Sequence, residues 1–273
     1  MPVTRRIDDE QGAEARGEGP VPAVTRAAAI LGALAAAGGV PLSSSELSRQ
    51  LGLPKSSTAN LCQALEAERL IVRRDGGYAL GRRLVELGGA YLSSVDQVRA
   101  FYDACREQPH LSQQTARVAV LDGMDVLYLA RYDGMQPIRL TANIGDRFPA
   151  HCTATGKTLL AMLDAAVLDE RLRGRARLVQ LTDRSIADPG ALRAELERVR
   201  GDGYAMDDEE TTPGVTCVAI AVPGSRTDSD PFAISITSMT SQLTPELTVR
   251  LLGELRVVAE RMSNPLIAGP RSR

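Results

Sequence analysis

The chain has 273 residues, of which 44% are hydrophobic, and its formal net charge is −2 at pH 7. This length allows one large or two modest globular domains, and no apolar run approaches the roughly 20 residues that a membrane-spanning helix needs. The cysteines are dispersed and the two histidines lack the spacing of zinc ligands, so we expect no disulfide framework, no metal and no cofactor. The four cysteines are Cys62, Cys105, Cys152 and Cys217.

Residues 1–20 are rich in glycine and charge and poor in bulky apolar side chains. They also lack the apolar core of a secretion signal, so we expect a disordered leader here and a short tail at residues 266–273. Without a secretion signal, the dispersed cysteines are expected to stay reduced, which predicts a cytoplasmic protein.

The first helix is predicted from Val24 to Ala37 and ends at Gly38 and Gly39. Its apolar face is expected to consist of Val24, Ala28, Leu31 and Leu34. A second helix begins after Ser43, because Ser43 and Glu46 have the spacing of a capping box, in which each side chain binds the backbone N–H of the other residue.

The second and third helices are joined by a tight turn. Gly52 suits a left-handed helix end, and Pro54 suits the first position of the next helix. The third helix has an apolar stripe formed by Thr58, Leu61, Cys62 and Leu65. Strand-like runs at Ile71–Arg74 and Tyr78–Leu80 then flank the turn signal Asp75-Gly76-Gly77. This order predicts a winged helix-turn-helix, whose third helix enters a DNA major groove.

The local charge favours DNA binding by this segment. Residues 21–83 hold eight Lys or Arg against four Asp or Glu, a net charge of +4, whereas residues 1–20 carry −2 and residues 84–273 carry −4. Cations are expected to hold phosphates and small polar side chains to face bases. The predicted DNA-binding residues are Ser44, Lys55, Ser56, Ser57, Asn60, Arg73 and Arg74. The alternative is a helix-turn-helix that serves only packing.

A connecting helix is expected over residues 82–95, because apolar residues recur there at helical spacing, and it would pack against another surface such as a partner subunit. The strand-like runs beyond it are Ala116–Leu121, Val126–Arg131, Ile138–Ala142, Val215–Val222 and Phe232–Thr237. The predicted helices are Gly156–Leu163, Pro189–Arg200 after the cap Asp188, and Pro245–Met262 after the cap Thr244. This alternation predicts an α+β domain with a mostly antiparallel sheet.

Enzyme-like motifs in this half are not supported. Residues 153–158 resemble the end of a phosphate-binding loop, but that loop requires glycine where His151 stands. His151 and Cys152 invite a Cys-His nucleophile, yet neighbours in an extended segment point to opposite faces. Lys157 is expected to face solvent or to add a charge near a binding site. We therefore assign no catalytic residue.

Several segments, in this order and spacing, resemble IclR-type bacterial transcriptional regulators from about Val24 to Met262. They are LSSSELSRQLGLPKSS, VAVLDGMDVLYLAR, HCTATGKTLLA, GYAMDDEETTPGVTCVA and ISIT. The resemblance implies a winged helix-turn-helix, a linker helix and a GAF-like domain that binds a small metabolite, in a dimer or a dimer of dimers. The chain differs from the family at Ala59-Asn60, where many members have His-Arg, and at Arg69, where a glycine usually ends the helix. Its operator should therefore differ, with Asn60 as a candidate adenine reader.

The resemblance also implies effector-binding residues. By position these are Gly145, Asp146, Asp207, Cys217, Ser235 and Thr237. From the residues alone, the helix beginning near Gly156 offers N–H groups that suit a carboxylate. Structural alternatives remain, because Asp207 heads an acidic run typical of a solvated loop and Cys217 suits an apolar core. Ser235 and Thr237 share one sheet face, which could be either a binding site or solvent-facing.

The sequence therefore predicts a disordered leader (1–20), a winged helix-turn-helix (21–81), a linker helix (82–95), an effector-binding domain (96–265) and a tail (266–273). The expected function is a ligand-responsive, DNA-binding transcriptional regulator. Its expected partners are double-stranded operator DNA, a small organic or aromatic acid, and further copies of the same chain. The alternative is a metabolite-binding module or hydrolase-like enzyme with a vestigial helix-turn-helix, and a gel shift with the upstream DNA would distinguish the two.

Overall fold

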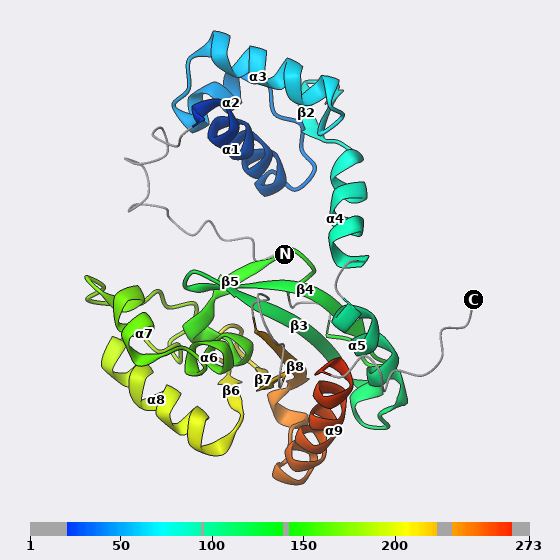
Figure 1. Ribbon diagram of the computed structural model, residues 1–273, viewed down its shortest axis with the longest axis vertical. Helices are drawn as coiled ribbons and strands as arrows, with labels where there is room; N and C mark the ends of the chain where they lie inside the picture. The colour runs from blue at the N-terminus through cyan, green and yellow to red at the C-terminus, as the bar shows by residue number, and fades with distance from the viewer. Residues whose placement is uncertain (1–20, 94–95, 139–141, 223–230, 264–273) are drawn as a thin grey trace. The chain divides into compact units, whose positions relative to one another are not determined.

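The computed structural model describes residues 21–93, 96–138, 142–222 and 231–263. The chain divides into two compact units at Ser94 and Val95, and each unit is described by itself (Figure 1). The expected leader and tail lie outside the described residues, as does most of the strand expected at Ile138–Ala142.

The first unit is a winged helix-turn-helix followed by one further helix. Its elements are α1 (Pro22–Ala36), α2 (Ser44–Leu51), α3 (Lys55–Ala67), β1 (Ile71–Arg74), β2 (Gly77–Leu80) and α4 (Arg83–Ser93). The buried core consists of Ile30, Ala33, Leu34, Leu47, Cys62, Leu65, Ile71 and Tyr78. The expected apolar face of α1 is wrong in part, because Val24 is 66% exposed and Ala28 is exposed. The helix is rotated so that Ile30 and Ala33 face the core instead.

Local capping determines the tight turn. Glu46 donates its backbone N–H to Ser43 Oγ at 3.2 Å, and Ser43 donates its own N–H to Glu46 Oε2 at 2.8 Å, so the predicted capping box is confirmed. Gly52 ends α2 in the left-handed conformation, with a φ of 64°. Pro54 precedes α3 as its N-cap rather than occupying the first helical position as predicted.

The end of α3 is unusual, because Arg69 adopts the left-handed conformation with a φ of 59°. An L-residue with a side chain is strained there by about 1–2 kcal/mol. The chain nevertheless turns, since the backbone N–H of Leu70 bonds the carbonyl of Leu65 at 2.9 Å. Gly81 packs so closely on the Arg69 carbonyl that a Cβ would collide with it. Arg69 therefore occupies a left-handed helix end of the kind that favours glycine.

The wing is tied to the segment before α2. Leu42 donates its N–H to the Tyr78 carbonyl at 2.9 Å, and Tyr78 donates to the Leu42 carbonyl at 2.8 Å. A Cβ on Gly77 would collide with the Leu42 backbone, so this approach requires glycine. The two-stranded wing is thus extended by an isolated bridge to Leu42.

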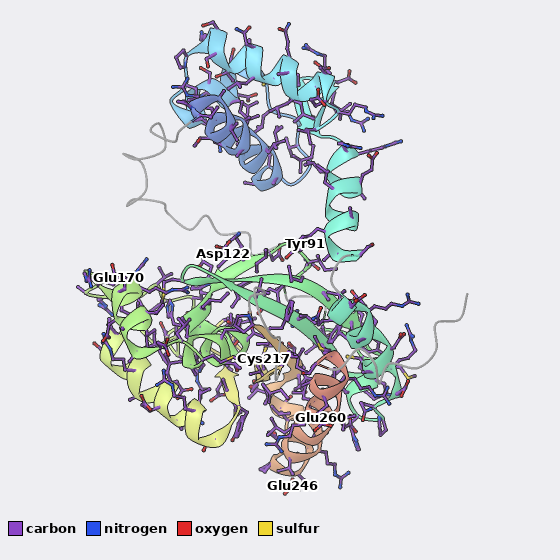
Figure 2. The ribbon with its side chains drawn as sticks, viewed as in Figure 1. Tyr91, Asp122, Glu170, Cys217, Glu246 and Glu260 are labelled. Carbon is purple, nitrogen blue, oxygen red and sulfur yellow. The ribbon has the colours of Figure 1, made fainter. Side chains whose placement is uncertain are left out.

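Among the described residues, α4 has no buried side chain. Its apolar residues Val85, Leu87 and Tyr91 are 76%, 49% and 55% exposed. Tyr91 of this helix is labelled in Figure 2.

The second unit is built on a six-stranded antiparallel sheet of order β5-β4-β3-β8-β7-β6. The strands are β3 (Thr115–Asp122), β4 (Asp125–Asp133), β5 (Arg147–Pro149), β6 (Ala205–Asp208), β7 (Val215–Ala221) and β8 (Phe232–Met239). The helices are α5 (Asp96–Glu107), α6 (Ala154–Ala161), α7 (Ala165–Leu172), α8 (Pro189–Asp202) and α9 (Pro245–Ser263). Short 3₁₀ turns occur at Leu111–Gln113, Ala150–Cys152 and Thr240–Gln242. The predicted fold class, an N-terminal winged helix-turn-helix and an α+β domain with an antiparallel sheet, is confirmed.

Helices cover both sides of this sheet (Figure 1). On one side α6 packs on β3, β4, β6, β7 and β8, and α8 packs on α6. On the other side α5 and α9 pack on each other and on the central strands. The residues between the sheet and α6 therefore lie in the interior.

Most predicted elements of this unit are present, with some boundary differences. Helix α6 begins at Ala154, two residues before the predicted Gly156, because Thr153 caps it and accepts the Gly156 N–H at 2.9 Å. The sequence analysis missed α5, α7, β5 and β6. Strand β6 was missed because its Asp-rich sequence is typical of a loop.

Candidate functional site

The predicted DNA-binding residues of α3 lie on its outward face. Lys55, Ser56 and Asn60 are exposed and Ser57 is half-buried, whereas Thr58, Cys62 and Leu65 are buried against the core. Ser44 is half-buried at the first position of α2. The side chains expected to face bases are thus presented together by one rigid helix.

The two wing arginines differ in their contacts. Arg73 donates from Nη2 to the Tyr78 hydroxyl at 2.6 Å, and its guanidinium lies 4.8 Å from the centroid of the Tyr78 ring. Its Nε also lies 3.6 Å from Glu66 Oε1 on α3. Arg74 is exposed and points to the other face of the hairpin, because neighbours in a strand alternate. Arg73 therefore connects the wing to α3, whereas the side chain of Arg74 is exposed to solvent.

Four of the six predicted effector residues share one buried face of the sheet. The register pairs Asp207 with Cys217 and Cys217 with Thr237, across the adjacent strands β6, β7 and β8. Ser235 is two residues from Thr237 and points to the same face, which is the face covered by α6. Asp207, Ser235 and Thr237 are at most 3% exposed. The solvent-facing alternative for Ser235 and Thr237 is therefore wrong. Cys217 is seen within this unit in Figure 2.

Asp207 is held by the loop that follows it. Its Oδ1 accepts the N–H of Glu210 at 2.7 Å and of Thr211 at 3.1 Å, and its Oδ2 accepts the Thr211 hydroxyl at 2.6 Å. Burial raises the pKa of Asp207 against these hydrogen bonds. Asp207 is therefore not part of a solvated loop, which was the structural alternative for this acidic run.

Gly145 and Asp146 lie in the turn before β5. Gly145 has a φ of 88° and donates its N–H to the Tyr128 carbonyl at 2.8 Å. The Asp146 carboxylate accepts the Asn143 N–H at 2.7 Å within the same turn. Among the described contacts, none joins these two residues to the other four candidates.

Arg117 joins the four-residue cluster, although the sequence analysis did not single it out. It is 3% exposed, pairs with Ser235 in the β3–β8 register, and donates from Nη1 to Thr237 Oγ1 at 2.5 Å. Cys217 Sγ lies 3.2 Å from the same hydroxyl. Burial lowers the pKa of Arg117, but a guanidinium stays protonated in proteins. Arg117 is the only polar residue in the otherwise apolar run 116–121, and such a run is typical of a strand buried on both faces, so the sequence could have signalled an inward-facing charge.

Two family models match the sequence of this chain. The family model described as "IclR helix-turn-helix domain" matches residues 23–75, and the one described as "Bacterial transcriptional regulator IclR C-terminal" matches residues 89–264. The chain belongs to the IclR family of bacterial transcriptional regulators.

Individual relatives agree with this family. The chain is 30% identical to an HTH-type transcriptional repressor, AllR of Klebsiella pneumoniae, over 92% of each chain. It is similar to the crystal structure of an IclR transcriptional regulator from Alicyclobacillus acidocaldarius, with a TM-score of 0.79 and 26% identity over 90% of this chain and 98% of that one. An IclR homologue from Microbacterium hydrocarbonoxydans, complexed with 4-hydroxybenzoate, has the same fold, with a TM-score of 0.74 and 20% identity over 88% of this chain and 98% of that one. These relatives are regulators, and the expectation that the chain is not an enzyme is confirmed.

Lys157 of this IclR-family regulator is buried rather than solvent-facing. It is 1% exposed, and its Nζ forms ion pairs with Glu210 and with Glu195, the latter at 3.1 Å. The expectation of a solvent-facing side chain is wrong because α6 lies between the sheet and α8, so no side of α6 faces water.

His151 and Cys152 lie in a 3₁₀ turn, not in an extended segment as assumed from the sequence. Both side chains approach one carbonyl, with His151 Nε2 2.7 Å and Cys152 Sγ 3.6 Å from the Val179 oxygen. Burial raises the pKa of Cys152 to about 12 and lowers that of His151, so the thiol stays protonated and a poor nucleophile at neutral pH.

Within the described ranges, no three His, Cys, Asp or Glu side chains are grouped so that they could hold a metal ion. None of the helices in those ranges is both long and apolar enough to span a bilayer.

Proposed function

We propose that this IclR-family protein is a ligand-responsive regulator whose second unit binds a small organic or aromatic acid. The observation that carries the proposal is the buried cluster of Asp207, Cys217, Ser235 and Thr237 on one face of three adjacent strands. A few polar groups within apolar surroundings are typical of small-molecule sites. Gly145 and Asp146, from the turn before β5, are proposed as further effector residues.

On the DNA side, Ser56, Ser57 and Asn60 are proposed to face bases, because they lie on the outward face of α3. Lys55, Arg73 and Arg74 are proposed to hold phosphates, together with Ser44 at the start of α2. We propose that the protein acts on operator DNA in the cytoplasm.

An acid is proposed as the effector class because a related regulator of the same fold is described with 4-hydroxybenzoate. The effector would act by linkage. A ligand that binds one arrangement of the winged helix-turn-helix units more tightly than another must change the affinity for DNA by the same factor. We propose a homodimer or a dimer of dimers, so that two such units read half-sites about one helical turn or more apart. The exposed apolar residues of α4 support such self-association.

Two measurements test the proposal. Fluorescence anisotropy with the DNA upstream of the gene should show binding that weakens steeply with salt. A thermal-shift screen of carboxylic acids should find compounds that raise the melting temperature, because a ligand that binds only the folded state stabilises it. Those compounds should then shift the DNA affinity.

A matched pair of variants on one strand locates the effector site. Thr237→Val removes a hydroxyl on the α6 side of β8 and should weaken effector binding. Ser238→Ala, its buried neighbour, points to the opposite face and should leave effector binding unchanged. Equal binding by both variants would place the effector elsewhere, and an absence of DNA binding at low salt would remove the regulatory function.

A further inference from the structure

The residue that can recognise an acid at this site is a buried arginine. Arg117 is 3% exposed and lies on β3, between β4 and β8 in the centre of the sheet. It donates from Nε to the Ala142 carbonyl at 2.9 Å and from Nη1 to Thr237 Oγ1 at 2.5 Å. Its guanidinium carbon lies 5.8 Å from the centroid of the Tyr128 ring. These contacts hold the cation in one place within the interior.

This cation contacts the residues already proposed for the effector. Thr237 Oγ1 accepts from Arg117 and is 3.2 Å from Cys217 Sγ, so one hydroxyl connects the two side chains. Ser235 faces Arg117 directly across the β3–β8 register. A ligand that binds against Cys217 and Thr237 would therefore lie beside a positive charge.

The alternative anion site, the N-terminus of α6, is less suitable. Thr153 Oγ1 already accepts the Gly156 N–H at 2.9 Å, and the Thr153 carbonyl accepts the Lys157 N–H at 2.9 Å. Arg117 differs because a guanidinium has five N–H donors and keeps its charge when buried. It can bind both oxygens of one carboxylate, which a neutral amide cannot match.

We propose that Arg117 binds the carboxylate of the effector and thereby restricts this regulator to anionic ligands. This inference rests on the proposed effector site and specifies its chemistry. Arg117 would be the specificity-determining residue, while Cys217, Ser235 and Thr237 shape the rest of the site.

The first test needs no variant, because it compares acids with their neutral amides on the wild-type protein. The probes are 4-hydroxybenzoate with 4-hydroxybenzamide, benzoate with benzamide, and succinate with succinamide, each titrated by calorimetry. The acids that bind should do so about tenfold more tightly than their amides, a difference of about 1.4 kcal/mol, since hydrogen bonds to a charged group are stronger than those to a neutral one.

The second test uses substitutions. Arg117→Met should weaken binding of the acid by at least about 30-fold, the loss expected when one partner of a buried charge pair is removed. Arg117→Lys keeps the charge but lacks the planar guanidinium group. Its affinity for the acid should therefore lie between those of the wild type and of Arg117→Met. Arg193→Met is the control, because Arg193 is an exposed arginine of the same unit, paired with Asp169 at 2.8 Å.

The results separate this inference from the proposed function. If amides bind as tightly as acids, or if Arg117→Met keeps wild-type affinity for a bound acid, the role of Arg117 is overturned while the effector site stands. If neither acids nor amides bind the wild-type protein, the proposed acid effector itself is wrong, and the inference fails with it. Should Arg117→Met fail to fold, the acid–amide comparison on the wild type still decides the question.

Discussion

Lys157 and Glu210 form a buried ion pair in the second unit. Lys157 comes from α6 and Glu210 from the loop after β6, and both are at most 7% exposed. Glu210 also donates its backbone N–H to Asp207 at 2.7 Å. The pair therefore holds the loop that fixes one of the proposed effector residues.

Removing the cation should be costly. Lys157→Met would leave Glu210 buried without its cation, and such losses destabilise proteins by about 3–5 kcal/mol. The double variant Lys157→Met with Glu210→Gln should recover part of this loss, because the buried carboxylate is removed too. Urea unfolding at about pH 8, above the raised pKa of Glu210 of about 7, measures both values.

Arg193→Met is again the control, since its exposed ion pair should contribute no more than about 1 kcal/mol. If Lys157→Met were no more destabilising than this control, Lys157 would not be a buried structural cation.

The stability of the second unit should depend on pH through Glu210. Burial raises the pKa of Glu210 from 4.5 to about 7, so the folded protein holds a proton that the unfolded chain releases. The contribution of this group is therefore largest below about pH 4.5 and is lost as the pH rises through about 7, by about 3 kcal/mol in total. Glu210→Gln should lack this loss. Unfolding free energies of both proteins across this range check it, and a difference that stays constant with pH would contradict it.

Replacing each of two glycines of the first unit by alanine should change its stability in opposite directions. Gly77→Ala should destabilise the unit and weaken DNA binding, because a Cβ would push the wing away from Leu42. Gly32→Ala should stabilise it by about 0.5–1 kcal/mol, because Gly32 lies inside α1 with open space around it. Thermal melting of the two variants tests this pair, and a similar loss in both would show that the wing contact does not matter.

Substitution of the two wing arginines should have different effects on DNA binding and on stability. Arg74→Ala should flatten the slope of log affinity against log salt by about 0.9, the value for one lost phosphate contact. Arg73→Ala should also lower the melting temperature of the first unit, because it loses the hydroxyl of Tyr78 and the carboxylate of Glu66. Arg106→Ala, a surface change in the second unit, is the control. An unchanged slope for Arg74→Ala would remove Arg74 from the DNA interface.

The winged helix-turn-helix fold of the first unit could be predicted well, because the sequence features that determine it are local. The Ser43–Glu46 capping box, the left-handed Gly52 and the wing turn each depend on contacts between residues within a few positions of each other. The rotation of α1 could not be predicted in the same way. Alanine-rich helices offer several similar faces, and packing against α3 decides which one is buried.

The effector site was predicted only in part. The family resemblance indicated Asp207, Cys217, Ser235 and Thr237, and the strand register brings these four together. It gave no sign of Arg117, whose contact with Thr237 joins residues 120 positions apart. Gly145 and Asp146 lie in a turn that the contacts of the described residues do not connect to the other four.

The sequence by itself thus determined the family and most of the helices and strands, because helix caps, turns and alternating strands are encoded by neighbouring residues. The DNA-binding residues that it indicates stay a prediction. Only the tertiary structure decided which charges are buried. Lys157 was expected to face solvent or to lie near a binding site, and Arg117 was not singled out, yet the packing of α6 on the sheet removes both from water. Burial is a property of the whole fold, since a charge leaves water only when elements distant in sequence close over it.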